Sequence, residues 1–292
     1  MIYDTIERYG PLFTGHAMIR VGVAAIVALG AMSAAVAAPP ETVEIYAAGS
    51  LRGVVGELAQ EAGATYQVEV KSTFGGSGSL RERIEKGESP DLFLSADVGS
   101  PHKLAEQGRT VVPAIPFARN RICIVSRRSA GVTAANLIDR MLAKDVRLKT
   151  SQPIADPGGD YAWAILDRID TLRPGAGAIL KAKAQANMSL VANPTSPGQS
   201  PAAAQFASHQ IDMSITYCSG SAALEREAPD LASLVVPAQL DPHPLYGIAV
   251  LSNKPQAQKL ALFLLSEKGQ ALITSQGLVP LTGPTPPEAV EH

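Results

Sequence analysis

The sequence has 292 residues, of which 46% are hydrophobic and 18% are charged, and its formal net charge is −2. This length and composition are sufficient for one large domain or two smaller domains with a hydrophobic core. The nearly balanced charge argues against the basic stripe typical of nucleic-acid-binding proteins. An aromatic content of only 5% argues against a site built from stacked rings.

The first 38 residues have the pattern of an export signal. Arg20 precedes the apolar stretch Val21–Gly30, and the small residues Ala35–Ala38 follow. A positive residue, an apolar segment and a small-residue cleavage site predict a secretory signal peptide within the leader 1–38, with Met18 as the predicted start. The alternative is a retained membrane anchor, because the apolar run is near the lower length for a span. The signal-peptide interpretation places the mature protein in the periplasm, secreted through the inner membrane.

Strand-like and helix-like segments alternate along the rest of the chain. Residues 43–47 alternate like a strand, residues 51–62 carry apolar side chains at helical spacing, and Leu92-Phe93-Leu94 is typical of a buried parallel strand. This alternation predicts an α/β fold with parallel sheets covered by helices. The Pro-rich, acidic tail 282–292 is predicted to be frayed.

Two turns rich in small residues, Ala48–Leu51 and Phe74–Leu80, fall between a predicted strand and a predicted helix. The free backbone N–H groups and the dipole of a helix N-terminus favour an anion, and ligands of open α/β sheets bind at this strand edge. The alternative is that Ser50 and Ser79 are ordinary helix N-caps. Because there are two such turns, the anion-site hypothesis and the N-cap alternative carry equal weight.

Three segments resemble one family of binding proteins. Ile45–Leu51 resembles its opening strand and loop, Ser72–Leu80 its second ligand loop, and Pro90–Asp97 its most recognisable run. Gly269–Ala271 followed by Gly277–Val279 resembles its C-terminal end. The family is the periplasmic molybdate-binding protein of ABC importers, which has the type II periplasmic binding fold.

The resemblance implies a two-lobed α/β fold, each lobe a mostly parallel sheet flanked by helices, with the ligand in the cleft between the lobes. Lobe one would comprise 42–116 plus 244–281, and lobe two 117–243. The implied function is capture of a tetrahedral oxyanion, molybdate or tungstate, and its delivery to a membrane ABC permease. We expect a monomer without a cofactor and without a nucleic-acid partner.

Members of this family bind the oxyanion with serine and tyrosine hydroxyls and backbone N–H groups, without a balancing cation. Such neutral donors form charge-assisted hydrogen bonds with a dianion, and they disfavour a protonated anion, which presents a donor of its own. Carried over by position, the molybdate or tungstate contacts would be the side chains of Ser50, Ser77 and Tyr217, with further ligand contacts from Gly49, Gly76, Gly158, Gly159 and Gln199.

Two residues depart from the family pattern. Asp160 follows a shortened loop and either faces the anion, which it would repel, or caps the next helix and points away. Gln199 replaces a typically apolar residue, and its amide either donates to the ligand or is solvated. These departures leave open a different anion or a small organic molecule with an acidic group.

No catalytic motif is recognisable. The five histidines are scattered, HExxH, CxxC and GxSxG are absent, and no Lys follows the run Gly75–Ser79 as a P-loop requires. We therefore expect a binding protein rather than an enzyme, with a ligand-sensing domain as the alternative. Cys123 and Cys218 either pair in an oxidising compartment or remain two buried thiols.

Overall fold

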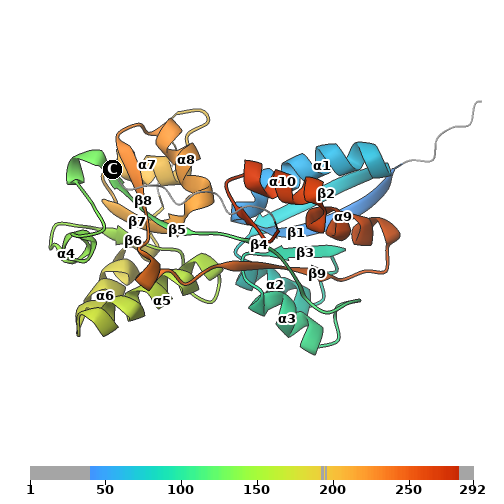
Figure 1. The fold of residues 1–292 in the computed structure, drawn as a ribbon, viewed down its shortest axis with the longest axis horizontal. Coiled ribbons are helices and arrows are strands. Elements are labelled where there is room, and N and C mark those ends of the chain that lie inside the picture. The colour runs from blue at the N-terminus through green and yellow to red at the C-terminus, as the bar shows by residue number, and fades with distance from the viewer. Residues whose placement is uncertain (1–39, 192–193, 195, 283–292) are drawn as a thin grey trace, which may run out of the picture. The chain divides into compact units, whose positions relative to one another are not determined.

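The computed structural model describes residues 40–191, 194 and 196–282. All of these residues belong to one compact unit, in which two sheets are each flanked by helices (Figure 1). The predicted leader 1–38 and the predicted tail beyond Thr282 lie outside the described residues. Within the described ranges, no helix has the length and apolar character needed to cross a membrane.

The first sheet has six strands in the order β10-β4-β9-β3-β1-β2. β1 pairs in parallel with β2 and β3, whereas β9 and β10 pair antiparallel with their neighbours. The sheet is therefore mixed, because the chain leaves it through β4 and returns through β9 in the opposite direction. The strands are β1 (Glu41–Ala48), β2 (Val68–Gly75), β3 (Leu92–Ser95), β4 (Ile115–Arg119), β9 (Leu245–Val250) and β10 (Val279–Pro280).

The second sheet has four strands in the order β6-β7-β5-β8. β5 pairs antiparallel with both β7 and β8, and only β6 and β7 run in parallel. The prediction of mostly parallel sheets thus holds for the first three strands of the chain and for one pair of the second sheet. The strands are β5 (Ile122–Arg127), β6 (Leu148–Lys149), β7 (Met213–Tyr217) and β8 (Leu231–Val235).

Helices cover both faces of each sheet (Figure 1). Beside the first sheet, α1, α9 and α10 lie on one side, and α2 and α3 lie on the other. Beside the second sheet, α4, α5 and α6 lie together, and α7 and α8 form a separate group away from them. The bounds are α1 (Arg52–Tyr66), α2 (Ser77–Glu85), α3 (Gly99–Glu106), α4 (Leu137–Leu142), α5 (Pro157–Leu172), α6 (Ala176–Met188), α7 (Pro201–Ala207), α8 (Cys218–Glu227), α9 (Pro255–Leu265) and α10 (Glu267–Ser275), with short 3-10 helices at η1 (Gly49–Leu51), η2 (Arg128–Ala130) and η3 (Ala238–Leu240).

The side chains of β1 alternate between two hydrophobic clusters. Val43 and Ile45 belong to the large core cluster that includes α1 and α9, whereas Tyr46 packs with Phe93 and with Leu80 of α2. Both faces of the strand are buried, as expected for a central strand between two helical layers. The burial of both faces fixes the end of β1, and with it the position of the turn that follows.

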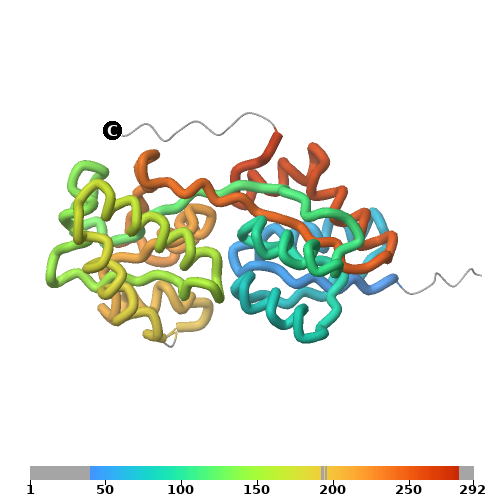
Figure 2. Tube along the Cα trace, turned by 90° about the horizontal axis from the view of Figure 1, so that it is seen from below, coloured from blue at the N-terminus to red at the C-terminus, as the bar shows by residue number. Residues whose placement is uncertain are grey.

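Two segments of chain connect the sheets, one between β4 and β5 and one between β8 and β9 (Figure 2). They are hydrogen-bonded to each other, since the backbone N–H of Asn120 donates to the carbonyl of Pro244 at 3.1 Å. The lobe boundary expected between Pro116 and Phe117 falls inside β4, and the first sheet continues to Arg119.

Candidate functional site

A polar cavity of about 610 Å³ lies where elements of the two sheets meet. This volume is within the usual range of small-molecule sites, roughly 300–1,000 Å³. The lining comes from the turns after β1 and β2, the loop before α5, and the passage from β7 into α8. Both turns that the sequence singled out therefore contribute to this cavity.

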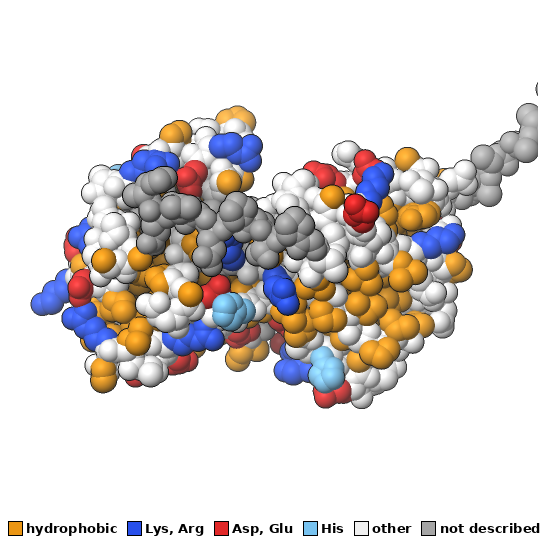
Figure 3. All heavy atoms as spheres, viewed as in Figure 1, with side chains coloured by type: hydrophobic (Ala, Val, Ile, Leu, Met, Phe, Trp, Pro, Cys, Tyr) orange, Lys and Arg blue, Asp and Glu red, His pale blue; other side chains and the backbone are white. Residues whose placement is uncertain are grey.

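A second hollow of about 640 Å³ has a different chemistry. It is lined by the apolar segment Val111–Pro116 together with Val250, Ala261 and Leu262, and Gln258 is its one polar side chain. Hydrophobic side chains gather on this face of the molecule, over β9 and α9 (Figure 3). The hollow offers few donors for an anion, so the polar cavity is the better candidate for the site.

Three helix N-termini at the cavity have no side-chain cap within the described part of the chain. They are those of η1, which leads into α1, of α2, whose N-cap is Gly76, and of α8, whose N-cap is Tyr217. The cavity is lined by Gly49 at the start of η1, by Gly76 before α2, and by Ser219 and Gly220 in the first turn of α8. The first N–H groups of a helix have no partner within the helix and carry its positive end, so this arrangement favours an anion.

The N-terminus of α5 is different because it is already capped. Asp156 is the N-cap residue, and its Oδ1 accepts the backbone N–H of Gly158 at 2.9 Å. Both residues line the cavity. The resemblance implied that the Gly158 amide donates to the ligand, but in this structure the amide donates to a carboxylate of the same turn.

Tyr217 presents a buried hydroxyl to the cavity. The residue ends β7, is 9% exposed, and packs edge-on against Tyr161 and Tyr246. Its hydroxyl makes no hydrogen bond of standard geometry with the described residues, although the hydroxyl of Tyr246 is, after burial, one of the groups that raise its pKa. Burial raises the pKa of Tyr217 well above its usual value, so the hydroxyl keeps its proton. An unpaired buried donor is costly, and an anionic ligand would satisfy it.

Ser50 belongs to a hydrogen-bond chain that joins the two sheets. Its Oγ lies 2.9 Å from the hydroxyl of Tyr246, which accepts from Nδ2 of Asn120 at 3.0 Å. Asn120 Nδ2 also lies 2.9 Å from Oγ of Ser219, on the cavity wall. Either hydroxyl of the Ser50–Tyr246 pair can be the donor, and when Tyr246 donates to Ser50 the Ser50 proton is free for a ligand.

Sequence reasoning identified Ser50 but missed Tyr246, Asn120 and Ser219. Asn120 lies in the segment between β4 and β5, and Tyr246 lies at the start of β9, directly after the segment that returns from the second sheet. This position beside the two connecting segments is the signal that could have identified them. Ser219 follows Tyr217 by two residues, at the same end of the same strand.

Ser77 and Gly159 are buried beside the cavity but do not line it. Ser77 is fully buried, and its Oγ accepts the N–H of Ala96 at 3.0 Å, which ties the start of α2 to the segment after β3. A Cβ on Gly159 would approach the backbone N of Pro153 to 2.4 Å, so this glycine allows the preceding loop to pack closely.

Gln199 and Asp160 also lie off the cavity wall. Gln199 lies just before α7, where Ser200 is the N-cap residue. Asp160 lies in the first turn of α5, and its Oδ1 accepts the backbone N–H of Ile154 at 2.9 Å. The carboxylate that faces the cavity is therefore that of Asp156, and Asp160 holds the loop that precedes α5.

Arg52 adds a positive charge to the cavity wall. Its guanidinium carbon lies 4.2 Å from the centre of the Phe74 ring, at a distance typical of cation–π contact. The resemblance implied a site without a balancing cation, so Arg52 is a departure from the expected pattern. Its position directly after Leu51, at the start of α1, is the sequence signal for it.

The loop before α5 packs against the start of α2, so segments of the two sheets touch beside the cavity. The N–H of Ser79 donates to the carbonyl of Ala155 at 3.1 Å. A Cβ on Gly78 would lie 1.7 Å from the carbonyl oxygen of Ile154. Ile154 itself has φ 71°, which is unfavourable for a β-branched residue, and the bond from its N–H to Asp160 stabilises this conformation.

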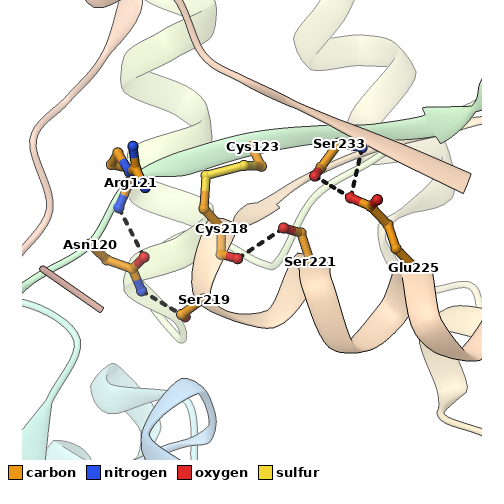
Figure 4. The surroundings of a disulfide bond; sticks show 8 residues. All are labelled: Asn120, Arg121, Cys123, Cys218, Ser219, Ser221, Glu225 and Ser233. Atoms are coloured by element: carbon orange, nitrogen blue, oxygen red, sulfur yellow. Dashed lines mark hydrogen bonds between the residues drawn. A yellow bond between two sulfur atoms is a disulfide. The ribbon is translucent and has the colours of Figure 1, made fainter. Parts of the chain in front are cut away.

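Cys123 and Cys218 form a disulfide, which settles the alternative left open by the sequence (Figure 4). The bond joins β5 to the first residue of α8, and Ser219 follows directly on the cavity wall. The closed loop spans 95 residues of sequence. In the part of the chain that the structure describes, no three His, Cys, Asp or Glu side chains form a group that could hold a metal ion.

Solved structures with the same fold bind different ligands. The periplasmic molybdate-binding protein of Azotobacter vinelandii aligns with a TM-score of 0.64 at 20% identity, covering 82% of this chain and all of that one. The sulfate-binding protein SubI of Mycobacterium tuberculosis aligns with a TM-score of 0.64 at 18% identity, covering 82% and 87%. Iron-bound HitA of Pseudomonas aeruginosa aligns with a TM-score of 0.63 at 20% identity, covering 86% and 90%. These similarities confirm the two-lobed periplasmic binding protein fold.

One relative in sequence aligns with this chain over nearly the whole of the relative's length. The uncharacterized protein PM1146 of Pasteurella multocida is 33% identical over 243 residues, which are 81% of this chain and 98% of that protein. Residues 43–279 match the family described as bacterial extracellular solute-binding protein. The chain therefore belongs to the bacterial extracellular solute-binding proteins.

Proposed function

We propose that this protein captures a tetrahedral oxyanion in the polar cavity, outside the cytoplasm, and delivers it to a membrane ABC importer. The family supports the role of a solute receptor. Three uncapped helix N-termini, the Ser50 hydroxyl and Arg52 support an anionic ligand. Molybdate and tungstate are the oxyanions that the sequence resemblance predicts.

The observation that carries this proposal is the Tyr217 hydroxyl. It is protonated and buried, and it makes no hydrogen bond of standard geometry with the described residues, although, after burial, the neighbouring Tyr246 hydroxyl helps to raise its pKa. A ligand that presents only acceptors, such as an oxyanion, would supply the missing partner. The bond would be charge-assisted, and such bonds contribute roughly 1.5–3 kcal/mol each.

A second candidate is an organic anion of the same binding class. The cavity of about 610 Å³ lies in the middle of the range of small-molecule sites, so it has room for more than a single small oxyanion. Asp156 and Arg52 place opposite charges on its wall. Both features favour a ligand with a second polar group.

The test is calorimetric titration of the purified protein with molybdate, tungstate, sulfate, phosphate and several organic acids, repeated with Tyr217→Phe. The variant removes one hydroxyl, and we expect the affinity for the bound anion to fall roughly tenfold to hundredfold. The free energy of unfolding of the unliganded variant should be equal or higher, since an unpaired buried donor has been removed.

Tyr66→Phe is the matched control because Tyr66 lies at the end of α1, against Lys259 and away from the cavity. It should leave the affinity unchanged. If no anion in the panel binds to the folded protein, the proposal of anion capture fails. If Tyr217→Phe binds as tightly as the wild type, the assignment of Tyr217 fails while anion capture stands.

A further inference from the structure

Asp156 places a carboxylate on a wall of the cavity where donors were expected. A Cβ built on Gly158 would lie close to three side chains at once. It would be 3.4 Å from Oδ1 of Asp156, 3.3 Å from a ring carbon of Tyr217 and 3.5 Å from Oγ of Ser151. The carboxylate therefore shares this part of the wall with two hydroxyl-bearing residues. Asp156 is also one of the charges that raise the pKa of Tyr217, in addition to burial.

The carboxylate constrains which oxyanion can bind. One of its oxygens accepts from Gly158, and a carboxylate offers further acceptor positions but no donor. A dianion that presents only acceptors would face it without a hydrogen bond and with repulsion. A ligand that carries an O–H beside its negative charge would donate to Asp156 while it accepts from Tyr217.

Resting on the proposed anion capture, we propose that Asp156 makes the site selective for a phosphate-type oxyanion that carries a hydrogen-bond donor. The donor is either the proton of hydrogen phosphate or the hydroxyl of a small phosphate ester. Arg52, Ser50 and Gly76 lie beside the first sheet and bind the negative charge, whereas Asp156 lies beside the second sheet and binds the donor.

The test compares anions that differ in their donors. Sulfate and molybdate carry none at neutral pH, hydrogen phosphate carries one, and glycerol phosphate carries hydroxyls even when its phosphate is fully ionised. Calorimetry on the wild type should give the donor-bearing anions an affinity at least tenfold higher than sulfate or molybdate. Methyl phosphate, whose ester group carries no hydroxyl, separates the two sources of the donor when it is compared at a pH where its phosphate is fully ionised: a loss of binding relative to glycerol phosphate identifies the ester hydroxyl.

Asp156→Asn keeps the helix cap, because the amide oxygen can accept from Gly158, but it turns a donor toward the cavity. We expect the preference to reverse, with roughly tenfold to hundredfold weaker binding of the favoured anion and tighter binding of sulfate and molybdate. Asp160→Asn is the matched control, since it removes a carboxylate from the same turn of α5 but off the cavity wall.

The outcomes separate this inference from the proposed function. If the wild type prefers molybdate or sulfate, or if both Asn variants shift the affinities alike, the role of Asp156 is overturned while anion capture stands. If the wild type binds none of these anions, the proposed function falls, and the inference with it. A reversal in Asp156→Asn alone supports both.

Discussion

The N-termini of α2 and α5 follow similar glycine-containing turns but present opposite chemistry to the cavity. α2 begins after Gly76 without a side-chain cap, whereas the carboxylate of Asp156 caps α5. The two ends touch, since a Cβ on Gly76 would lie 3.2 Å from Cβ of Asp156. A glycine-rich turn before a helix can thus predict where an anion site lies, but the N-cap residue decides whether the N–H groups are still available.

The largest expected effect concerns α8, whose N-terminus is open like that of α2 but is fixed by the disulfide. Replacing both Cys123 and Cys218 by Ala should lower the free energy of unfolding by about 2–4 kcal/mol, because the unfolded chain is no longer closed into a loop. Ligand affinity should fall as well, since Ser219 and Gly220 lose their anchor. Urea unfolding with and without ligand measures both effects.

A reducing agent provides the control for the disulfide prediction. Reduction of the wild type should reproduce the loss of stability, and the double variant should not respond to the reductant. An equal response of the two proteins would contradict the assignment of the stabilisation to this bond.

The start of the first lobe was predictable from local pattern. Residues 43–47 were predicted as a strand and 51–62 as a helix, and the structure has β1 at Glu41–Ala48 and α1 at Arg52–Tyr66. These elements are determined by short-range periodicity and by burial on both faces of β1. The position of Ser50 in the turn between them follows directly.

The rest of the cavity depends on contacts between distant parts of the sequence. Asn120 and Tyr246 are 126 residues apart and meet only because two crossing segments pair. No local pattern reports such pairing. The capping of Gly158 by Asp156 is local, but the resemblance gave Gly158 as a ligand contact and the cap was not predicted.

A substitution at Gly78 would break the contact between the N-termini of α2 and α5. Gly78→Ala would place a methyl group against the carbonyl oxygen of Ile154, which is backbone and cannot swing aside. The loop before α5 must then move, and we expect a loss of about 1–3 kcal/mol in the free energy of unfolding together with weaker ligand binding. Denaturant unfolding and calorimetry on the same preparation check both parts.

Gly56→Ala is the matched substitution for this test. A Cβ on Gly56 meets nothing within 4 Å, and the residue lies inside α1. Alanine is the better helix former, so the variant should gain about 0.5–1 kcal/mol. Destabilisation by both substitutions would show that crowding against Ile154 is not the cause.

The smallest effect is a change in pH dependence from Asp160, the second carboxylate in the first turn of α5. Its pKa is raised above the ordinary value of 3.8, first by burial and then by the charges of Asp97 and Asp156, while the bond from Ile154 and the charge of Lys103 lower it. A raised pKa in the folded state means that the contribution of Asp160 to stability is greatest below pH 3.8 and is lost as pH rises through the folded pKa. Asp160→Asn should remove this decline, because its amide oxygen can still accept from Ile154 without a charge. Unfolding midpoints should therefore diverge in favour of the variant as pH rises above 3.8, and parallel pH profiles would mean that Asp160 titrates as it does in the unfolded chain. In that case Asp156 alone would distinguish the electrostatics of the α5 terminus from those of α2.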